Sequence, residues 1–210
     1  MPASVEFAPD LDAWDAWRPE EIARRLAGVR VPWYVAGGWA IDLLFGHQRR
    51  EHDDLEVAIP HNHFGEIAMA LPDLDFFVVG SGKAWPLHQA GDAFETEHQT
   101  WGRDPDTGAW RLDLFREPSE GSEWICRRDP AISLPYDRLI ARTADGIPYG
   151  RPEVVLLFKA KAARPKDEDD FAAALPLLDA PARQWLQDTL KRIHPGHHWI
   201  AMLSTKEGRP

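Results

Sequence analysis

Residues 37–57, GGWAIDLLFGHQRREHDDLEV, contain the pattern that best indicates the fold of this chain. Two glycines open the stretch, and the apolar spacing of WAIDLLFG up to Gly46 predicts a short helix. The basic loop HQRREH follows, and DLEVAI at residues 54–59 predicts a strand. Because a short strand is also expected at residues 33–36, the order is strand, Gly-Gly turn, helix, basic loop and strand.

Asp54 and Glu56 are two residues apart in the expected strand. Alternate side chains of a strand share a face, so both carboxylates point one way while Leu55 and Val57 point into the core. Like charges about 7 Å apart are unfavourable unless solvent or a cation lies between them. A pair of divalent ions would stabilise this arrangement. The alternative is an edge strand with a solvated acidic face.

A second alternating strand is expected at residues 109–115, AWRLDLF. Asp113 falls on the face opposite the apolar side chains of that strand. A third carboxylate would complete the oxygen coordination of a two-metal phosphoryl-transfer site or accept the substrate proton. A plain surface position is the alternative for Asp113.

These residues resemble the polymerase β-like nucleotidyltransferase superfamily, with Gly-Gly, a helix, an Asp-x-Asp/Glu strand and a later strand aspartate. Residues 37–57 are similar to the aminoglycoside and lincosamide nucleotidyltransferases, which have Gly-Gly-Trp, a helix, Gly, basic residues and His-x-Asp-x-Asp. The resemblance covers residues 33–59 closely, and it is weaker at Asp113 and in the C-terminal helices. Glu56 departs from the Asp that those enzymes usually carry. The implied fold is α+β, with a mixed sheet, flanking helices and a helical C-terminal unit.

The resemblance implies that Asp54, Glu56 and Asp113 are catalytic and hold two Mg²⁺ ions. Asp113 would be a metal ligand, the base or both. Gly37 and Gly38 would leave backbone N–H groups at a helix N-terminus free for the triphosphate. Their alternative is an ordinary turn between a strand and a helix.

The basic loop would bind and orient the nucleotide. Arg50 would donate to the β- and γ-phosphates, because a planar guanidinium suits bidentate contacts, while Arg49 is expected to face water. His52 would be an orienting residue beside the metal ions.

The character of the chain changes near residue 150, where helices are expected from Pro152, at Lys166–Leu178 and at Ala182–Ile193. We therefore predict a nucleotidyltransferase domain at residues 1–148 and a helical domain at residues 149–210. Further predicted elements are a helix at residues 11–28 broken near Pro19, a helix at residues 61–71 and a strand at residues 76–80.

The segment LFKAKAARPKDEDD at residues 157–170 is similar to the Lys and Lys-Asp-x-x-Asp elements of related enzymes. Lys159 and Lys161 lie about 200° apart on a helix, so one of them reaches the cleft, and Lys159 is the predicted nucleotide-binding residue. Asp167 and Asp170, with His52, are predicted acceptor-binding or supporting positions. Capping of a helix N-terminus is the alternative for both aspartates.

The charge and the tryptophan content of the chain indicate which classes of partner it can bind. With 34 acidic and 24 basic side chains, the net charge of −10 argues against a nucleic-acid partner and favours a cationic one, unless the acidity only keeps the protein soluble. Ten Trp suit stacking, although most of them are expected in the core. No apolar run is long enough to cross a membrane and no secretory signal is visible, so a cytoplasmic location is expected. The lone Cys126 is expected to be a buried hydrophobic residue.

The predicted reaction is in-line attack by a substrate hydroxyl on the α-phosphorus of ATP or another nucleoside triphosphate, with release of pyrophosphate. By resemblance, the acceptor is a small, hydroxylated, amine-bearing molecule such as an aminoglycoside or a lincosamide-like antibiotic. The alternatives are a toxin-type nucleotidyltransferase that modifies RNA or protein, and a catalytically silent nucleotide-binding module. The residues alone leave the acceptor and the nucleotide base open.

Overall fold

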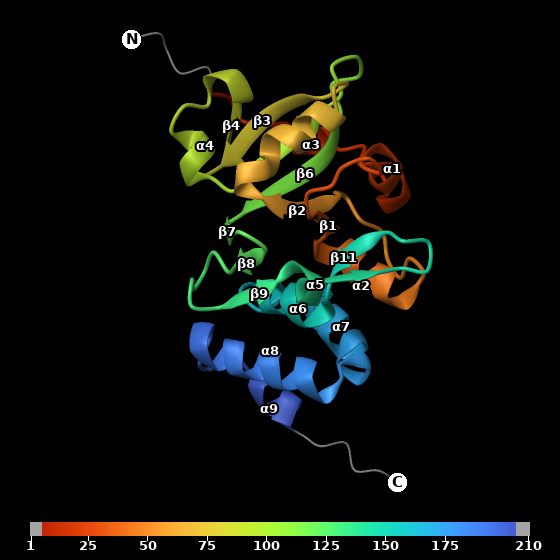
Figure 1. Cartoon of the computed structure of the whole chain (residues 1–210), viewed down its shortest axis with the longest axis vertical. Helices are drawn as coiled ribbons and strands as arrows, with labels where there is room; N and C mark the ends of the chain where they lie inside the picture. The colour runs from red at the N-terminus through yellow and green to blue at the C-terminus, as the bar shows by residue number, and fades with distance from the viewer. Residues whose placement is uncertain (1–5, 205–210) are drawn as a thin grey trace.

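The computed structural model describes residues 6–204, and within this range a mixed eight-stranded sheet forms the centre of the molecule (Figure 1). The strand order is β10-β11-β1-β2-β6-β5-β3-β4, with parallel pairing between β1 and β11 and between β2 and β6. These strands are β1 (Tyr34–Val35), β2 (Glu56–Pro60), β3 (Asp75–Gly80), β4 (Lys83–Pro86), β5 (Gln99–Arg103), β6 (Trp110–Glu117), β10 (Ile140–Arg142) and β11 (Pro148–Gly150). A small antiparallel sheet contains β7 (Ser119–Glu120), β8 (Glu123–Ile125) and β9 (Ser133–Pro135).

Helices flank the main sheet and form a stack at the C-terminal end of the molecule (Figure 1). The helices are α1 (Pro19–Arg25), α2 (Gly37–Phe45), α3 (Phe64–Ala70), α4 (Ala93–Thr96), α5 (Tyr136–Leu139), α6 (Pro152–Lys159), α7 (Pro165–Ala174), α8 (Ala180–Ile193) and α9 (Trp199–Ser204). Four short 3₁₀ turns also lie in the described range, at Leu11–Ala13, His61–His63, Leu87–Gln89 and Leu175–Leu177. The predicted fold class, a mixed sheet with flanking helices and a helical C-terminal unit, is confirmed.

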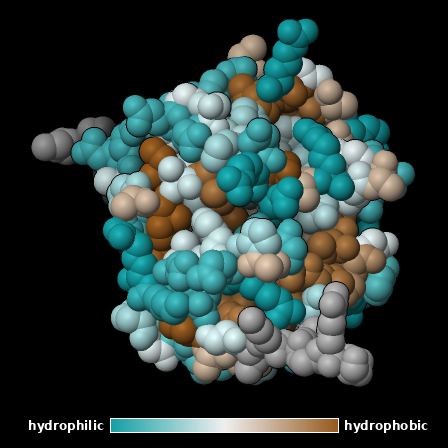
Figure 2. Space-filling view, turned by 60° about the horizontal axis from the view of Figure 1, so that its bottom comes forward, coloured by the Kyte–Doolittle hydropathy of each residue, from teal (hydrophilic) through white to brown (hydrophobic). Residues whose placement is uncertain are grey.

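None of the helices between residues 6 and 204 combines the length and the apolarity that a membrane crossing requires. Figure 2 shows the end of the molecule that carries the C-terminal helices, where hydrophobic side chains reach the surface as patches separated by hydrophilic ones.

The prediction of a helix over residues 11–28 was wrong in its first half. Helix α1 begins at Pro19, and Arg18 before it is extended, with φ −92° and ψ 160°. Proline disfavours helical geometry at the preceding residue, so a helix begins at Pro19 and does not continue through it with a kink. Trp14 forms a β-bridge with Trp110 instead, and its ring lies 5.0 Å from that of Trp101.

Helix α2 follows β1 directly, as the sequence predicts. It ends at Gly46, whose φ of 73° is the left-handed conformation that commonly terminates helices. The expected strand at residues 54–59 begins two residues later than predicted, at Glu56. The buried side chains of Leu55, Val57 and Ile59 point into the core, as expected.

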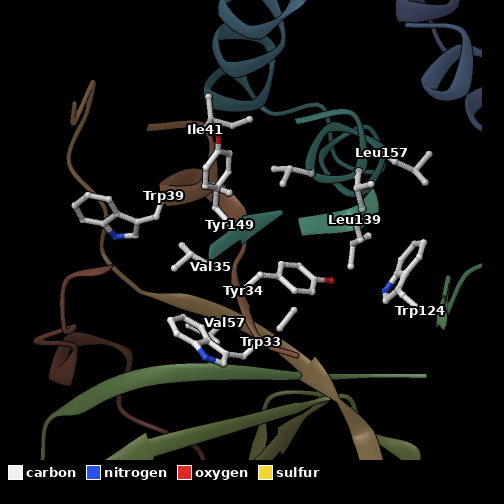
Figure 3. Close-up of a cluster of buried hydrophobic side chains, with 14 of the residues drawn as sticks. Trp33, Tyr34, Val35, Trp39, Ile41, Val57, Trp124, Leu139, Tyr149 and Leu157 are labelled. Carbon is white, nitrogen blue, oxygen red and sulfur yellow. The ribbon is translucent and has the colours of Figure 1, made fainter. Parts of the chain in front are cut away.

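The larger of two hydrophobic clusters among the described residues runs from Ile22 through the sheet to Trp199 and Leu203, and it includes the buried Cys126. Figure 3 shows part of it, where Tyr34 extends from β1 toward Leu139 and Trp124 while Val35 points the opposite way. The division predicted between residues 148 and 149 falls inside β11, a strand of the main sheet. Packing across this position fixes the C-terminal helices against the sheet.

Candidate functional site

Glu56 and Asp113 occupy paired positions on the neighbouring parallel strands β2 and β6. Their side chains therefore point from the same face of the sheet. Asp113 is buried, and its Oδ2 accepts a hydrogen bond of 2.6 Å from Nε2 of Gln99. Its Oδ1 is also buried and has no hydrogen-bond partner among residues 6–204. The structure thus brings together two predicted site residues that are far apart in the sequence.

Both carboxylates are held where negative charge is unfavourable. Burial raises the pKa of Asp113 well above its usual range, and repulsion from Glu56 adds to this. Burial and repulsion from Asp54 raise the pKa of Glu56 to about 7. Arg164 and Lys159 oppose the shift of Glu56. A bound cation would favour the ionised form of both carboxylates, because its positive charge would compensate their negative charges.

Asp54 lies in the loop before β2, so its predicted position inside the strand was wrong. It is half-buried and close enough to Glu56 and Asp113 to raise the pKa of both groups. Within the described part of the chain, no three His, Cys, Asp or Glu side chains are already grouped to hold a metal ion. The three carboxylates therefore share one region, but they are not a preformed coordination cage.

Gly37 and Gly38 lie at the start of α2, where no side chain of the described residues caps the helix. A Cβ atom at Gly37 would overlap Oε2 of Glu56, and Gly37 has a φ of 59°. A Cβ atom at Gly38 would overlap the Arg50 guanidinium and crowd the His52 ring. These close approaches show that the two glycines do more than form a turn, because they admit Glu56 and Arg50 to the helix N-terminus.

His52 is held in one orientation at this helix. Its ring stacks on Trp39 with centroids 4.4 Å apart, and its Nε2 lies 2.7 Å from Oδ2 of Asp42. Burial lowers the pKa of His52, although Asp42 opposes the shift, so the imidazole is neutral near pH 7. Asp42 also accepts the backbone N–H of Arg49 at 3.1 Å. Asp42 is a supporting residue that the sequence patterns did not single out.

Lys159 lies at the end of α6, where its Nζ is 2.9 Å from Asp170 and 3.1 Å from Asp167. Asp170 also faces Arg49 at 3.4 Å and Arg50 at 3.5 Å. Both aspartates are buried, and their carboxylates contact cations of the chain itself. This cluster connects the basic loop to α6 and α7, which favours a supporting function over direct contact with an acceptor.

Asp167 also caps α7, as its alternative interpretation predicts. It accepts the backbone N–H of Arg164 at 3.1 Å and the Nε of the same residue at 2.8 Å. Burial acts to raise the pKa of Asp167, but the hydrogen bonds from Arg164 and the charge of Lys159 outweigh it and lower the pKa. The carboxylate is therefore ionised and engaged.

A pocket of about 190 Å³ opens between α6 and the sheet face that carries Glu56. Its walls come from β1, β2, β6, α6 and the segment after β8, and its lining residues are Tyr34, Ala36, Gly37, Glu56, Ala58, Phe115, Glu117, Arg127, Arg128, Val154, Val155, Phe158, Lys159, Ala162 and Arg164.

Sequence reasoning assigned no function to Glu117, Arg127, Arg128 and Arg164. The alternation that places Asp113 on the site face also places Glu117 there, so the same signal could have found it. Arg164 directly precedes the proline that begins α7, which marks it as a helix-start residue. Arg127 and Arg128 lie in a turn without periodic pattern, and only the folded chain brings them to the pocket.

Comparison with known protein families finds a match in the part of the sequence that contains Gly37, Gly38, Asp54 and Glu56. Residues 20–83 match the aminoglycoside-2''-adenylyltransferase family. A lincosamide resistance protein from Staphylococcus haemolyticus is 26% identical over 74 residues, which cover 35% of this chain and 42% of that protein. The match therefore spans less than half the length of that relative.

Two solved structures share the fold over most of the chain. The crystal structure of ANT(2'')-Ia in complex with adenylyl-2''-tobramycin has a TM-score of 0.56 and 16% identity, covering 82% of this chain and 94% of that one. The lincomycin-bound crystal structure of the lincosamide antibiotic adenylyltransferase LnuA has a TM-score of 0.50 and 18% identity, covering 73% and 91%. The match over residues 20–83 and the shared fold confirm the resemblance of this chain to the aminoglycoside and lincosamide nucleotidyltransferases.

Proposed function

We propose that this chain transfers AMP from ATP to a hydroxyl of a small acceptor, an aminoglycoside or a lincosamide-like antibiotic. The observation that carries the proposal is the pairing of Glu56 with Asp113 beside the uncapped N-terminus of α2. The free N–H groups and the dipole of α2 would stabilise a phosphate anion at that terminus. The carboxylates of Glu56 and Asp113 lie beside the same place. The relatives with tobramycin and lincomycin support the choice of acceptor.

The donor set fits magnesium. Carboxylate oxygens are ligands that Mg²⁺ prefers, and Oδ1 of Asp113 is buried without a partner among the described residues. In the proposal Asp54, Glu56 and Asp113 would hold two Mg²⁺ ions, which requires these side chains to come closer together than they lie in the described structure. Bound Mg²⁺ would neutralise charge on the phosphates during transfer.

The residues of the chain then position the nucleotide. The N–H groups at Gly37 and Gly38 would bind phosphate oxygens, and Arg50 and Lys159 would add positive charge beside them. The acceptor hydroxyl attacks the α-phosphorus, the bond to pyrophosphate breaks, and Asp113 accepts the hydroxyl proton. The pairing of β6 with β2 places Asp113 for this function, because it brings the Asp113 carboxylate beside Glu56.

The test is an acceptor screen that measures pyrophosphate release and the mass of the modified acceptor. The panel contains aminoglycosides, lincosamides, RNA and protein, each with ATP and Mg²⁺. Pyrophosphate release together with an AMP-sized mass increase on an antibiotic supports the proposal. Product formed on RNA or protein alone would establish the toxin-type alternative, and nucleotide binding without any product would establish the silent module.

A further inference from the structure

Gln99 holds the Asp113 carboxylate from the neighbouring strand. Its Nε2 donates to Oδ2 of Asp113 at 2.6 Å, whereas Oδ1 has no hydrogen-bond partner among residues 6–204. Gln99 lies opposite Phe115 in the register of β5 with β6, and Phe115 is two residues after Asp113. The side chains of Gln99 and Asp113 therefore share one face of the sheet, the face that also carries Glu56.

The donor at Asp113 is an uncharged amide, which sets this carboxylate apart from others in the chain. Three other buried carboxylates contact cationic side chains, namely Glu117 with Arg127, and Asp167 and Asp170 with Lys159. An ion pair compensates the charge of a carboxylate and leaves less of it for a metal ion, whereas a hydrogen bond from an amide orients the group without neutralising it.

The charges around Asp113 agree with this distinction. Burial and the negative charge of Glu56 raise the pKa of Asp113, with a smaller contribution from Asp54, and the amide of Gln99 opposes them. The indole of Trp101 acts in the same direction as Gln99. None of these groups is a cation, so a positive charge for Asp113 has to come from a ligand.

Trp101 is a second fixed neighbour of the carboxylate. It lies directly opposite Asp113 in the register of β5 with β6, and it is 8% exposed. Its ring centre lies 5.0 Å from that of Trp14 and 5.2 Å from that of Trp110. Packing on both rings prevents Trp101 from moving away, so Asp113 is placed against a rigid wall while Gln99 holds one of its oxygens.

We propose that Gln99 is a positioning residue of the catalytic centre, which fixes the plane of the Asp113 carboxylate for Mg²⁺ and for the acceptor hydroxyl and leaves its charge uncompensated. Hydrogen bonds to carboxylates that bind metal ions orient these ligands. The inference rests on the proposed function, because it assigns the support of a residue that this function uses. Gln99 does not contact the reacting atoms and acts through Asp113.

The first test is Gln99→Met, which keeps the length of the side chain and removes the N–H donor. With Mg²⁺ saturating and the antibiotic that the acceptor screen identifies, kcat should fall about 10-fold or more, as is typical when the partner of a metal ligand is lost. The KM values of ATP and of the antibiotic should change much less. Gln89→Met is the matched control, because Gln89 is exposed and its amide contacts only the adjacent His88 among the described residues.

Metal binding provides a readout that does not depend on turnover. Mn²⁺ replaces Mg²⁺ as the probe, and its binding to the full chain with a non-hydrolysable ATP analogue is measured by electron paramagnetic resonance. Gln99→Met should weaken Mn²⁺ binding about 10-fold. Inorganic tripolyphosphate without metal should bind as it binds the unmodified chain, because the groups at Gly37 and Gly38 are intact. Thermal unfolding checks the fold of each variant.

A double-mutant cycle separates positioning of Asp113 from a purely structural function of Gln99. If Gln99 acts through Asp113, Gln99→Met should lower kcat and Mn²⁺ affinity far less in the Asp113→Asn background than in the unmodified chain. If Gln99 only stabilises the pairing of β5 with β6, the two backgrounds should lose stability and activity equally.

Gln99→Lys tests the importance of an uncharged donor. The lysine would again hold the carboxylate, but its charge would compensate that of Asp113, so Mn²⁺ affinity should stay low. Full recovery of Mn²⁺ affinity and kcat by this variant would contradict the inference.

Unchanged kcat and Mn²⁺ affinity in Gln99→Met, or equal losses in both backgrounds of the cycle, would overturn the function assigned to Gln99 while the proposed reaction stands. Failure of the unmodified chain to bind Mn²⁺ and the ATP analogue would overturn the proposed function together with it.

Discussion

A side chain at Gly37 would occupy the space that Oε2 of Glu56 fills. The first residue of α2 and the first residue of β2 are therefore in contact only because one of them lacks a Cβ atom. This contact positions a carboxylate at a helix N-terminus, next to the place where the proposed triphosphate binds.

Gly37→Ala should reduce both stability and turnover. The φ of 59° is strained for alanine, by about 1–2 kcal/mol, and the added methyl group would displace Glu56. Gly28→Ala is a matched control, because a Cβ atom there meets nothing within 4 Å. Chemical denaturation and pyrophosphate release measure the two effects. Equal stability and activity of the two variants would contradict the contact.

Asp54→Asn, Glu56→Gln and Asp113→Asn should each remove nearly all turnover, by about 100-fold or more, while the chain stays folded. The reason is that neutral amides replace the anionic oxygens that hold Mg²⁺ and accept the proton. Pyrophosphate release measures the loss, and circular dichroism monitors the fold. Turnover near that of the unmodified enzyme in the Asp54 or Glu56 variant would end the two-metal proposal.

Arg50→Ala should weaken ATP binding by about 10-fold, and Arg49→Ala by clearly less. Arg50 lies against Gly38 at the N-terminus of α2, whereas the guanidinium of Arg49 lies 4.7 Å from the ring centre of Phe45 at the other end of that helix. Both contact Asp170, so the Arg49 variant also controls for loss of that ion pair. Titration with a non-hydrolysable ATP analogue provides the comparison, and a larger loss at Arg49 would reverse the assignment.

Without Mg²⁺, the free energy of unfolding should fall as pH rises from about 4.5 toward 7 and beyond. Glu56 has a pKa of about 7 in the folded chain and 4.5 as its ordinary value, so over this range the folded state binds more protons than the unfolded state. The loss is on the order of 3 to 4 kcal/mol, at about 1.4 kcal/mol for each pH unit between the two values. Asp113 acts in the same direction.

Urea denaturation at several pH values measures this effect. Glu56→Gln should flatten the pH dependence, and Mg²⁺ should restore stability to the unmodified chain above pH 7. Glu120→Gln, at an exposed position, should leave the slope unchanged. A stability that rises between pH 5 and pH 8 without metal would contradict the burial of uncompensated charge at Glu56.

If the acceptor is a polycationic aminoglycoside, its apparent KM should rise with salt. The net charge of −10 attracts a polycation over long distances, and the Debye length falls from about 10 Å at 0.1 M salt to about 3 Å at 1 M. Contacts between Mg²⁺ and the phosphates are screened less, so the KM of the nucleotide should change less. Initial rates at three salt concentrations decide, and a KM independent of salt would indicate a neutral acceptor.

The sequence by itself determined the part of the fold whose signals are local. Gly46 terminates α2, the alternation of apolar residues orients β2 and β6, and the Gly-Gly pair precedes the helix, because each effect acts within a few residues. The same alternation singled out Glu56 and Asp113, whereas Arg50 and Lys159 were predicted from the resemblance to the nucleotidyltransferases. It failed where segments are too short to have a period, as in the two-residue β7 and the three-residue β11.

Only the tertiary structure decided which distant residues meet. The register of β2 with β6 places Asp113 beside Glu56 and leaves Asp54 in the loop, since strand ends depend on the partner strand. Packing of α6 and the turn after β8 against the sheet brings Arg127 to Glu117, and α7 brings Asp170 to Lys159. Such contacts arise from burying a common core and satisfying buried charges across elements, and no spacing within one segment contains that information.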